Sequence, residues 1–227
     1  MIPSLKVPTG LARLLVWCSA LLALAASYSD PAGAFPVKSW YEMRWEGVHR
    51  QETDESCGPA SVVTLLETYF EVDVDEPEVF TLATAYLDDL EREVARALRA
   101  GTSLRGLQDA MNHLGFRSVG VRIAYDDLLR YFDEVGMPMI AHFDLPEKHF
   151  VVIAGKLESG SILVADPSRG RYVLSRAEAL ARFSGHALLY EPPRPVDEGL
   201  VERQLQEAER FERFARRLAG ASREWGA

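Results

Sequence analysis

The hydrophobic pattern of the chain changes its period near residue 137, and this change limits the fold more than any other feature. Before it, apolar residues recur mainly at helical spacing, in segments 59–70, 76–99, 103–114 and 125–135. After it come mainly short apolar runs bounded by turn residues, at 137–143, 149–157, 161–165 and 186–190. Helices first and strands later is an α+β pattern. We therefore expect N-terminal helices packed on an antiparallel sheet.

The first 34 residues differ from the rest of the chain. Lys6 and Arg13 precede an uncharged run rich in Leu and Ala at 14–28, and Ala32-Gly33-Ala34 is a small-residue motif. This order is typical of a secretory signal peptide, so we expect cleavage after Ala34 and a periplasmic or secreted protein. The alternative is a retained anchor, but a run of about 15 residues is short for a bilayer, which needs about 20. We expect no stable membrane span after cleavage.

The remainder divides into three parts. Residues 35–191 form the expected domain, which starts with an irregular lead-in at 35–50. Residues 192–199 form a Pro-rich linker, and 200–227 an amphipathic helix with a thin apolar stripe. Two interpretations of this helix stay open. It docks on its own domain, or it binds a partner or a second copy of the chain.

Composition narrows the class of protein. With 48% apolar and 26% charged residues, the chain is typical of soluble globular proteins. A net charge of -9 without a basic stripe argues against nucleic acid as a partner. Once residues 1–34 are removed, Cys57 is the single cysteine, and the scattered histidines lack the spacing of metal ligands. We expect no metal and no cofactor.

Cys57 lies where a helix is expected to begin, because Pro59 suits a first helical turn. The free N–H groups and the dipole of a helix N-terminus stabilise a thiolate and can face a developing oxyanion. Gly58 has no side chain to obstruct a substrate carbonyl. Cys57 is therefore a candidate nucleophile, although an inert buried cysteine gives the same local pattern.

A cysteine nucleophile needs a base, and His149 is the best placed of the five histidines. It opens the apolar run 149–153, which puts an imidazole at the rim of a cleft with a rigid strand behind it. A solvent-exposed histidine at a strand end is the alternative. The other four histidines are less suited by position or surroundings: His49, His113, His142 and His186.

Asp166 and Gln51 complete the candidate set. Asp166 ends the next apolar run, and a hairpin through 158–160 would return it beside His149, given a register offset or a bulge. It is then the carboxylate that orients the imidazole, although a solvated turn Asp before Pro167 is common. Gln51 lies six residues before Cys57, and its amide can donate a hydrogen bond to an oxyanion.

These motifs together resemble the C39 family of peptidases, the papain-like domains that remove leader peptides from bacteriocins. The matching elements, in order, are Gln51, Ser56-Cys57-Gly58-Pro59-Ala60, His149-Phe150-Val151-Val152 and Asp166-Pro167. The segment 102–116 also resembles the second helical stretch of the family, and the resemblance covers about 45–191. It implies a papain-like α+β fold with Cys57 as nucleophile, His149 as base and acid, Asp166 as orienting carboxylate and Gln51 as oxyanion donor.

The implied activity is cleavage of a peptide or protein substrate at a small-residue site of the Gly-Gly type. The best-known members are domains of ABC transporters, whereas this chain has a signal-peptide pattern and an added C-terminal helix. Its layout is closer to exported relatives that include the peptidase of the functional-amyloid secretion system. Two alternatives remain: a non-catalytic peptide-binding module on the same scaffold, or another papain-like acyl-transfer enzyme.

Overall fold

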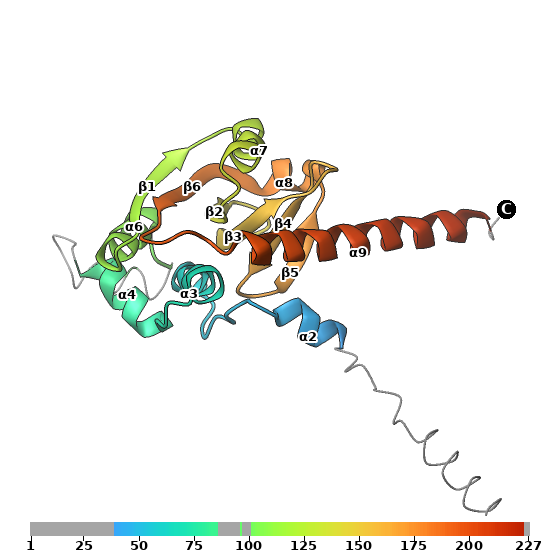
Figure 1. The fold of residues 1–227 in the computed structure, drawn as a ribbon. Helices are drawn as coiled ribbons and strands as arrows, with labels where there is room; N and C mark the ends of the chain where they lie inside the picture. Colours follow the sequence, from blue (N-terminus) through green and yellow to red (C-terminus); the bar gives the residue numbers. More distant parts are fainter. Residues whose placement is uncertain (1–38, 86–95, 97–100, 225–227) are drawn as a thin grey trace, which may run out of the picture. The chain divides into compact units, whose positions relative to one another are not determined.

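One six-stranded antiparallel sheet forms the centre of the fold (Figure 1). The computed structural model describes residues 39–85, 96 and 101–224. The strands are β1 (Arg117–Arg122), β2 (Met139–Phe143), β3 (His149–Lys156), β4 (Ile162–Asp166), β5 (Gly170–Leu174) and β6 (Phe183–Glu191). Their order across the sheet is β1-β6-β2-β3-β4-β5, so the last strand in sequence lies inside the sheet, between β1 and β2. The predicted α+β class is confirmed.

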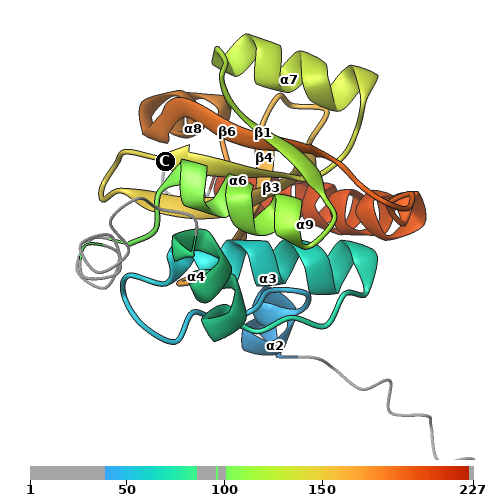
Figure 2. The same cartoon turned by 90° about the vertical axis from the view of Figure 1, so that its left-hand side faces the viewer.

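Helices cover both faces of this sheet. Their bounds are α2 (Trp40–Trp45), α3 (Cys57–Phe70), α4 (Glu76–Thr84), α6 (Leu104–His113), α7 (Tyr125–Glu134), α8 (Arg176–Arg182) and α9 (Glu198–Glu224). Figure 2 shows α3 and α4 on one side of the sheet and α7 on the other. A hydrophobic core lies on each face of the sheet, and strand β3 contributes to both because its side chains alternate. Phe150 and Val152 belong to the core that includes α3, while Val151 and Ile153 belong to the core that includes α7.

Helix α3 is the most deeply buried helix of the described chain. Twelve of its fourteen residues are buried, and Val62, Val63, Leu65 and Leu66 are fully enclosed. Burial of one such side chain contributes about 1.5–3 kcal/mol, so the helix is held firmly against β3. At its far end, Phe70 packs edge-on against Phe116, with ring centroids 5.0 Å apart. The first residue of α3, Cys57, therefore sits on a rigid support.

The predicted β3–β4 hairpin is present. Its turn lies at 158–160, where Gly160 has a positive φ of 75° and donates to the carbonyl of Leu157 at 2.9 Å. The hairpin is antiparallel, so the start of β3 and the end of β4 lie at the same end of the sheet. This arrangement brings the first residue of one strand, His149, near the last residue of the other, Asp166.

Two predicted boundaries differ from the structure. The lead-in at 35–50 was expected to be irregular, but Trp40–Trp45 is a helix, which is held by contacts with the distant strand β5 rather than by its short sequence. The C-terminal helix begins at Glu198, inside the predicted linker, because the Asp197 carboxylate accepts from the Leu200 N–H at 3.0 Å and caps the first turn.

Some predictions lie outside the described residues. The signal peptide at 1–34, part of the expected helix at 76–99, and residues 225–227 are among them. In the part of the chain that the structure describes, no helix has the length and apolar character needed to cross a membrane. The helix at the C-terminus docks through its first half, where Val201 and Ala208 are buried against the α3 side of the core.

Candidate active site

Cys57 is the first residue of α3, and 7% of its surface is exposed. Ser56 precedes it at the N-cap, but the Ser56 hydroxyl does not cap the helix. It bonds Thr53 instead, accepting from the Thr53 N–H at 3.1 Å and donating to the Thr53 carbonyl at 3.0 Å. The hydroxyl therefore closes the preceding loop and leaves the first N–H groups of the helix for another acceptor.

Gly58 has a different role from the one predicted. A Cβ at this position would collide with Oγ1 of Thr102 and come within 3.2 Å of Leu107. Gly58 thus faces the interior, and the missing side chain makes room for the segment that starts α6. The expectation that it clears a path for a substrate carbonyl is wrong in its physical reason, because buried neighbours already occupy that space.

His149 and Asp166 are in direct contact. The Nε2 atom of His149 lies 2.8 Å from Oδ1 of Asp166, with the two side chains 20% and 2% exposed. The hydrogen bond uses one ring nitrogen, which leaves Nδ1 for the thiol of Cys57. Cys57 lies close enough to act on this ring, since its interaction with the imidazole raises the pKa of His149. Three residues far apart in the sequence therefore meet at one end of the sheet.

A β-bulge in β3 sets the register that joins His149 to Asp166. Lys156 pairs with Ile162, but past the irregularity between Ile153 and Gly155 the register moves by one residue. Continuing the shifted register places Asp166 opposite Val151, on the same face as His149 and two residues from it. Without the shift, Asp166 would point to the opposite face. The bulge is therefore part of how the fold assembles this pair.

Asp166 accepts more hydrogen bonds than its partner histidine alone supplies. Oδ1 also accepts from the N–H and the hydroxyl of Ser168, at 2.8 and 2.7 Å, and from the Arg169 N–H at 3.2 Å. Burial by itself would raise the pKa of this carboxyl, but the bonds from His149 and Ser168 and the charge of His149 lower it to about 2. Asp166 is therefore a carboxylate at any working pH.

The environment of His149 favours the charged ring. Burial lowers the pKa of an imidazole, but here the hydrogen bonds and negative charges of Asp166 and Cys57 outweigh it and raise the pKa to about 9. At neutral pH the ring is thus an imidazolium between a carboxylate and a sulfur. This is the electrostatic arrangement that supports a cysteine nucleophile.

Gln51 is held beside this group by its backbone. Its N–H donates to the Pro167 carbonyl at 3.0 Å, which ties the loop before α3 to the residue after Asp166. One N–H of the side-chain amide donates to the Thr53 carbonyl at 2.7 Å, and Oε1 is buried without a hydrogen-bond partner among the described residues. The second amide N–H is left to donate to another acceptor.

The other candidate histidines have structural partners. His142 is part-buried and bonds the Ser184 hydroxyl at 3.0 Å, and burial lowers its pKa. His49 bonds the buried carboxylate of Glu76 at 3.1 Å. His186 lies on the surface of β6. Within the described residues, no group of His, Cys, Asp and Glu could hold a metal ion.

Sequence reasoning missed two residues at the site, Ser168 and Tyr172. Ser168 had a signal, because Asp-Pro-Ser followed by Arg-Gly is a pattern in which the Asp side chain bonds the backbone two residues on. Tyr172 had none, since its hydroxyl reaches Asp166 only through the pairing of β4 with β5. Both residues line a small hollow of about 60 Å³ together with His149 and Asp166; Cys57 does not line it.

Comparison with known proteins assigns the chain to a family. The family model described as "Peptidase C39 family" matches residues 46–194. This chain belongs to the peptidase C39 family. The region matched ends before α9, so that helix lies outside the family domain.

Similar C39 proteins include the probable functional amyloid protease FapD of Pseudomonas fluorescens, which is 31% identical over 159 residues. That alignment covers 68% of this chain and 66% of the relative; for the Pseudomonas aeruginosa protein of the same name, at 30% identity, it covers 61% and 58%. The chain thus spans less than two thirds of the length of these relatives. The probable microcin-H47 secretion/processing ATP-binding protein MchF of Escherichia coli is 29% identical over 65% of this chain and 19% of its own length.

Solved structures confirm the C39 fold. A double glycine motif protease from an AMS/PCAT transporter, in complex with a leader peptide, has a TM-score of 0.52 at 23% identity, covering 64% of this chain and 90% of that one. The peptidase domain of Streptococcus ComA has a TM-score of 0.51 at 19% identity, covering 64% and 97%. The resemblance seen in the sequence motifs, and the papain-like fold it implied, are therefore confirmed.

Proposed function

We propose that the chain is a cysteine peptidase in which Cys57, His149 and Asp166 form the catalytic triad and Gln51 completes the oxyanion hole. The observation that carries the proposal is the 2.8 Å bond between Asp166 and His149, a ring whose pKa both Asp166 and Cys57 raise, in a chain of the C39 family. Each group is supplied by a different element, and at neutral pH His149 is an imidazolium beside an ionised Asp166, as acyl transfer by a thiolate requires.

The reaction follows from these positions. The Cys57 sulfur attacks the peptide carbonyl carbon, an S–C bond forms, and the carbonyl oxygen takes the negative charge. The backbone N–H of Cys57 and the free amide N–H of Gln51 stabilise this oxyanion. The C–N bond then breaks as His149 gives its proton to the leaving amine. Water attacks the thioester, His149 takes a proton from it, and the acid product leaves with Cys57 restored.

The substrate we propose is an exported peptide or protein with small residues at the cleaved bond. A solved structural neighbour is a double glycine motif protease, which supports a site of this kind. The similarity to FapD proteins supports a link to secretion of a functional amyloid. The basic start, apolar run and small-residue motif of residues 1–34 support a periplasmic or secreted location, with Phe35 as the first mature residue.

The test compares exported peptides, by mass spectrometry, from cells that carry the chain or one of three variants. We expect Cys57→Ala and His149→Ala to lose the same cleavage products, while the matched control His186→Ala, at an exposed position of β6, retains them. Products retained in Cys57→Ala would refute the peptidase. A chain that binds peptides but cleaves none, with a thiol inert to iodoacetamide, would instead be the binding module. N-terminal sequencing of the exported chain tests cleavage after Ala34.

A further inference from the structure

The two oxygens of Asp166 have very different surroundings. Oδ1 accepts from His149 and from three donors of Ser168 and Arg169. Oδ2 accepts one bond within the described chain, from the hydroxyl of Tyr172 at 2.9 Å. The residue is 1% exposed, so water does not reach Oδ2 easily. The tyrosine is therefore what keeps the second oxygen satisfied.

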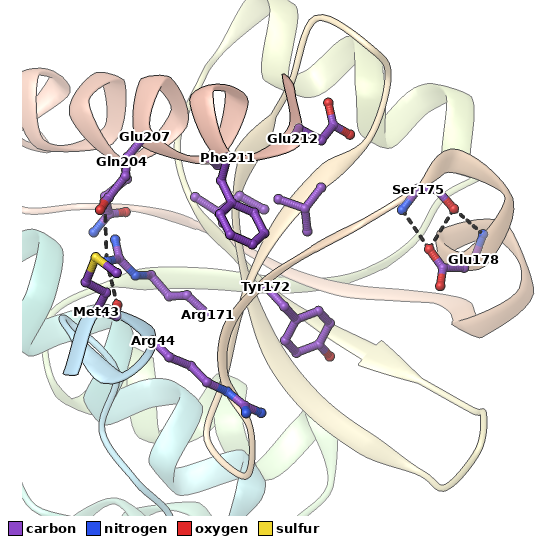
Figure 3. A pocket seen from close by; sticks show the side chains of 13 residues that line it. Met43, Arg44, Arg171, Tyr172, Ser175, Glu178, Gln204, Glu207, Phe211 and Glu212 are labelled. Carbon is purple, nitrogen blue, oxygen red and sulfur yellow. Dashed lines mark hydrogen bonds and ion pairs between the residues drawn. The ribbon is translucent and has the colours of Figure 1, made fainter. Parts of the chain in front are cut away.

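Tyr172 reaches Asp166 along the edge of the sheet. It lies on β5 opposite Val164, and Asp166 lies two residues further along β4 on the same face. Its ring lines a cavity of about 430 Å³ between α2, β5 and α9, and its hydroxyl points away from α9 (Figure 3). The same residue also lines the small hollow at His149. Tyr172 thus spans from the α9 cavity to the candidate active site.

We propose that Tyr172 is a positioning residue for the triad: its hydroxyl fixes the rotation of the Asp166 carboxylate, so that Oδ1 stays directed at His149. This inference rests on the proposed function. Without the hydroxyl, the buried Oδ2 would lack a donor, and the carboxylate would rotate to share the donors of Ser168 and Arg169 between both oxygens. Rotation would move Oδ1 off the line to Nε2 and weaken the bond that orients the imidazolium.

The tyrosine is a constant donor in this role. Burial raises its pKa well above the ordinary value, and the negative charge of Asp166 raises it further. The hydroxyl therefore keeps its proton throughout the pH range in which His149 titrates. The other charged or titratable groups around His149 come from every neighbouring element: Cys57 of α3, His142 of β2, Glu147 and Lys148 of the β2–β3 loop, Arg169 of the β4–β5 turn, and Arg182 of α8.

The experiment removes one oxygen atom, the hydroxyl oxygen of Tyr172. Tyr172→Phe removes the hydroxyl and keeps the ring, and Tyr131→Phe is the matched control, because its hydroxyl is buried without a hydrogen-bond partner among the described residues. His149 is titrated by NMR, and the rate at which iodoacetamide alkylates Cys57 is measured at neutral pH. In Tyr172→Phe we expect the pKa of His149 to fall by at least about 0.5 and alkylation to slow about threefold to tenfold. The control should match the unmodified chain.

A second comparison separates positioning from a general loss of stability. If Tyr172 acts through Asp166, the double variant Tyr172→Phe/Asp166→Asn should titrate like Asp166→Asn alone. An unchanged His149 titration in Tyr172→Phe, or an effect that persists undiminished without the carboxylate, would overturn the inference. Neither readout requires peptide cleavage, so it can fail while the peptidase proposal stands, and the cleavage test can fail without altering these titrations.

Discussion

Replacing Asp166 with Asn tests how much of the site depends on one carboxylate. The substitution keeps the size of the side chain but removes its charge and weakens the bond to Nε2 of His149, which is 2.8 Å long. Asp166 contributes both a hydrogen bond and a charge to the protonated state of His149, and its hydrogen bond is the largest contribution that raises the pKa. The pKa of His149 should therefore fall well below about 9 in this variant.

The expected magnitude follows from that pKa. The difference between about 9 and the ordinary 6.5 corresponds to roughly 3 kcal/mol of preference for the imidazolium, at about 1.4 kcal/mol per pH unit, and Asp166 shares it with Cys57. Loss of a hydrogen bond to a charged group costs about 1.5–3 kcal/mol, which predicts a fall in kcat/KM of about 10- to 150-fold. The stability of the fold also depends on the protonated state of His149. The raised pKa of His149 stabilises the fold below pH 6.5, and this contribution is lost as pH rises through about 9.

The assay is the pH dependence of cleavage, measured on a peptide that the unmodified chain processes. Activity should fall on the basic side near pH 9, where the imidazolium loses its proton, and this limb should move down by at least about one pH unit in Asp166→Asn. Asp144→Asn is the control, because it removes a nearby exposed charge that pairs with His142 instead. A basic limb at the same pH in Asp166→Asn would refute the assignment of this carboxylate to His149.

Four further changes test other parts of the structure. Gln51→Ala should lower kcat by about 10²- to 10³-fold with little change in KM, as for loss of an oxyanion donor; an unchanged kcat removes Gln51 from the site. Tyr69→Phe deprives buried Gln204 of its 2.8 Å bond, and chemical denaturation should show a loss of about 1–3 kcal/mol, whereas an unmoved midpoint means that the bond does not hold α9. Ser175→Ala breaks the capping box of α8 and should cost about 1 kcal/mol in the same assay. Gly155→Ala puts a Cβ within 2.9 Å of the Leu205 side chain and should lower the free energy of unfolding. The double variant Gly155→Ala/Leu205→Ala should recover part of that loss. If the losses of the two single variants simply add, the contact does not limit stability.

Local patterns in the sequence were enough to predict most of the elements. Ser103 caps the start of α6 and Gly115, with a positive φ of 89°, follows its end, and these are positions that serine and glycine favour by residue type alone. The alternation of apolar runs likewise predicted β3 and β4 to within one residue of their observed ends. Such features depend on neighbours within one turn or strand, and a single sequence carries that information.

The pieces that depend on distant neighbours could not be predicted in the same way. The bulge between Ile153 and Gly155 sets the face on which Asp166 lies, and Gly155 is its one local sign, since a glycine inside a strand often marks a bulge but does not fix the register that results. The position of β6 between β1 and β2 depends on the whole topology. The sequence suggested that Asp166 needed a bulge or an offset to meet His149, but only the fold provides it.

The most direct test of the central claim is the rate at which iodoacetamide alkylates Cys57 at neutral pH, in the chain and in His149→Ala, with the modified residue identified by mass spectrometry. If the imidazolium of His149 stabilises the Cys57 thiolate, removing the ring should slow alkylation at least about tenfold, while His186→Ala reacts like the unmodified chain. Equal rates in the chain and in His149→Ala would contradict the pairing of these two residues.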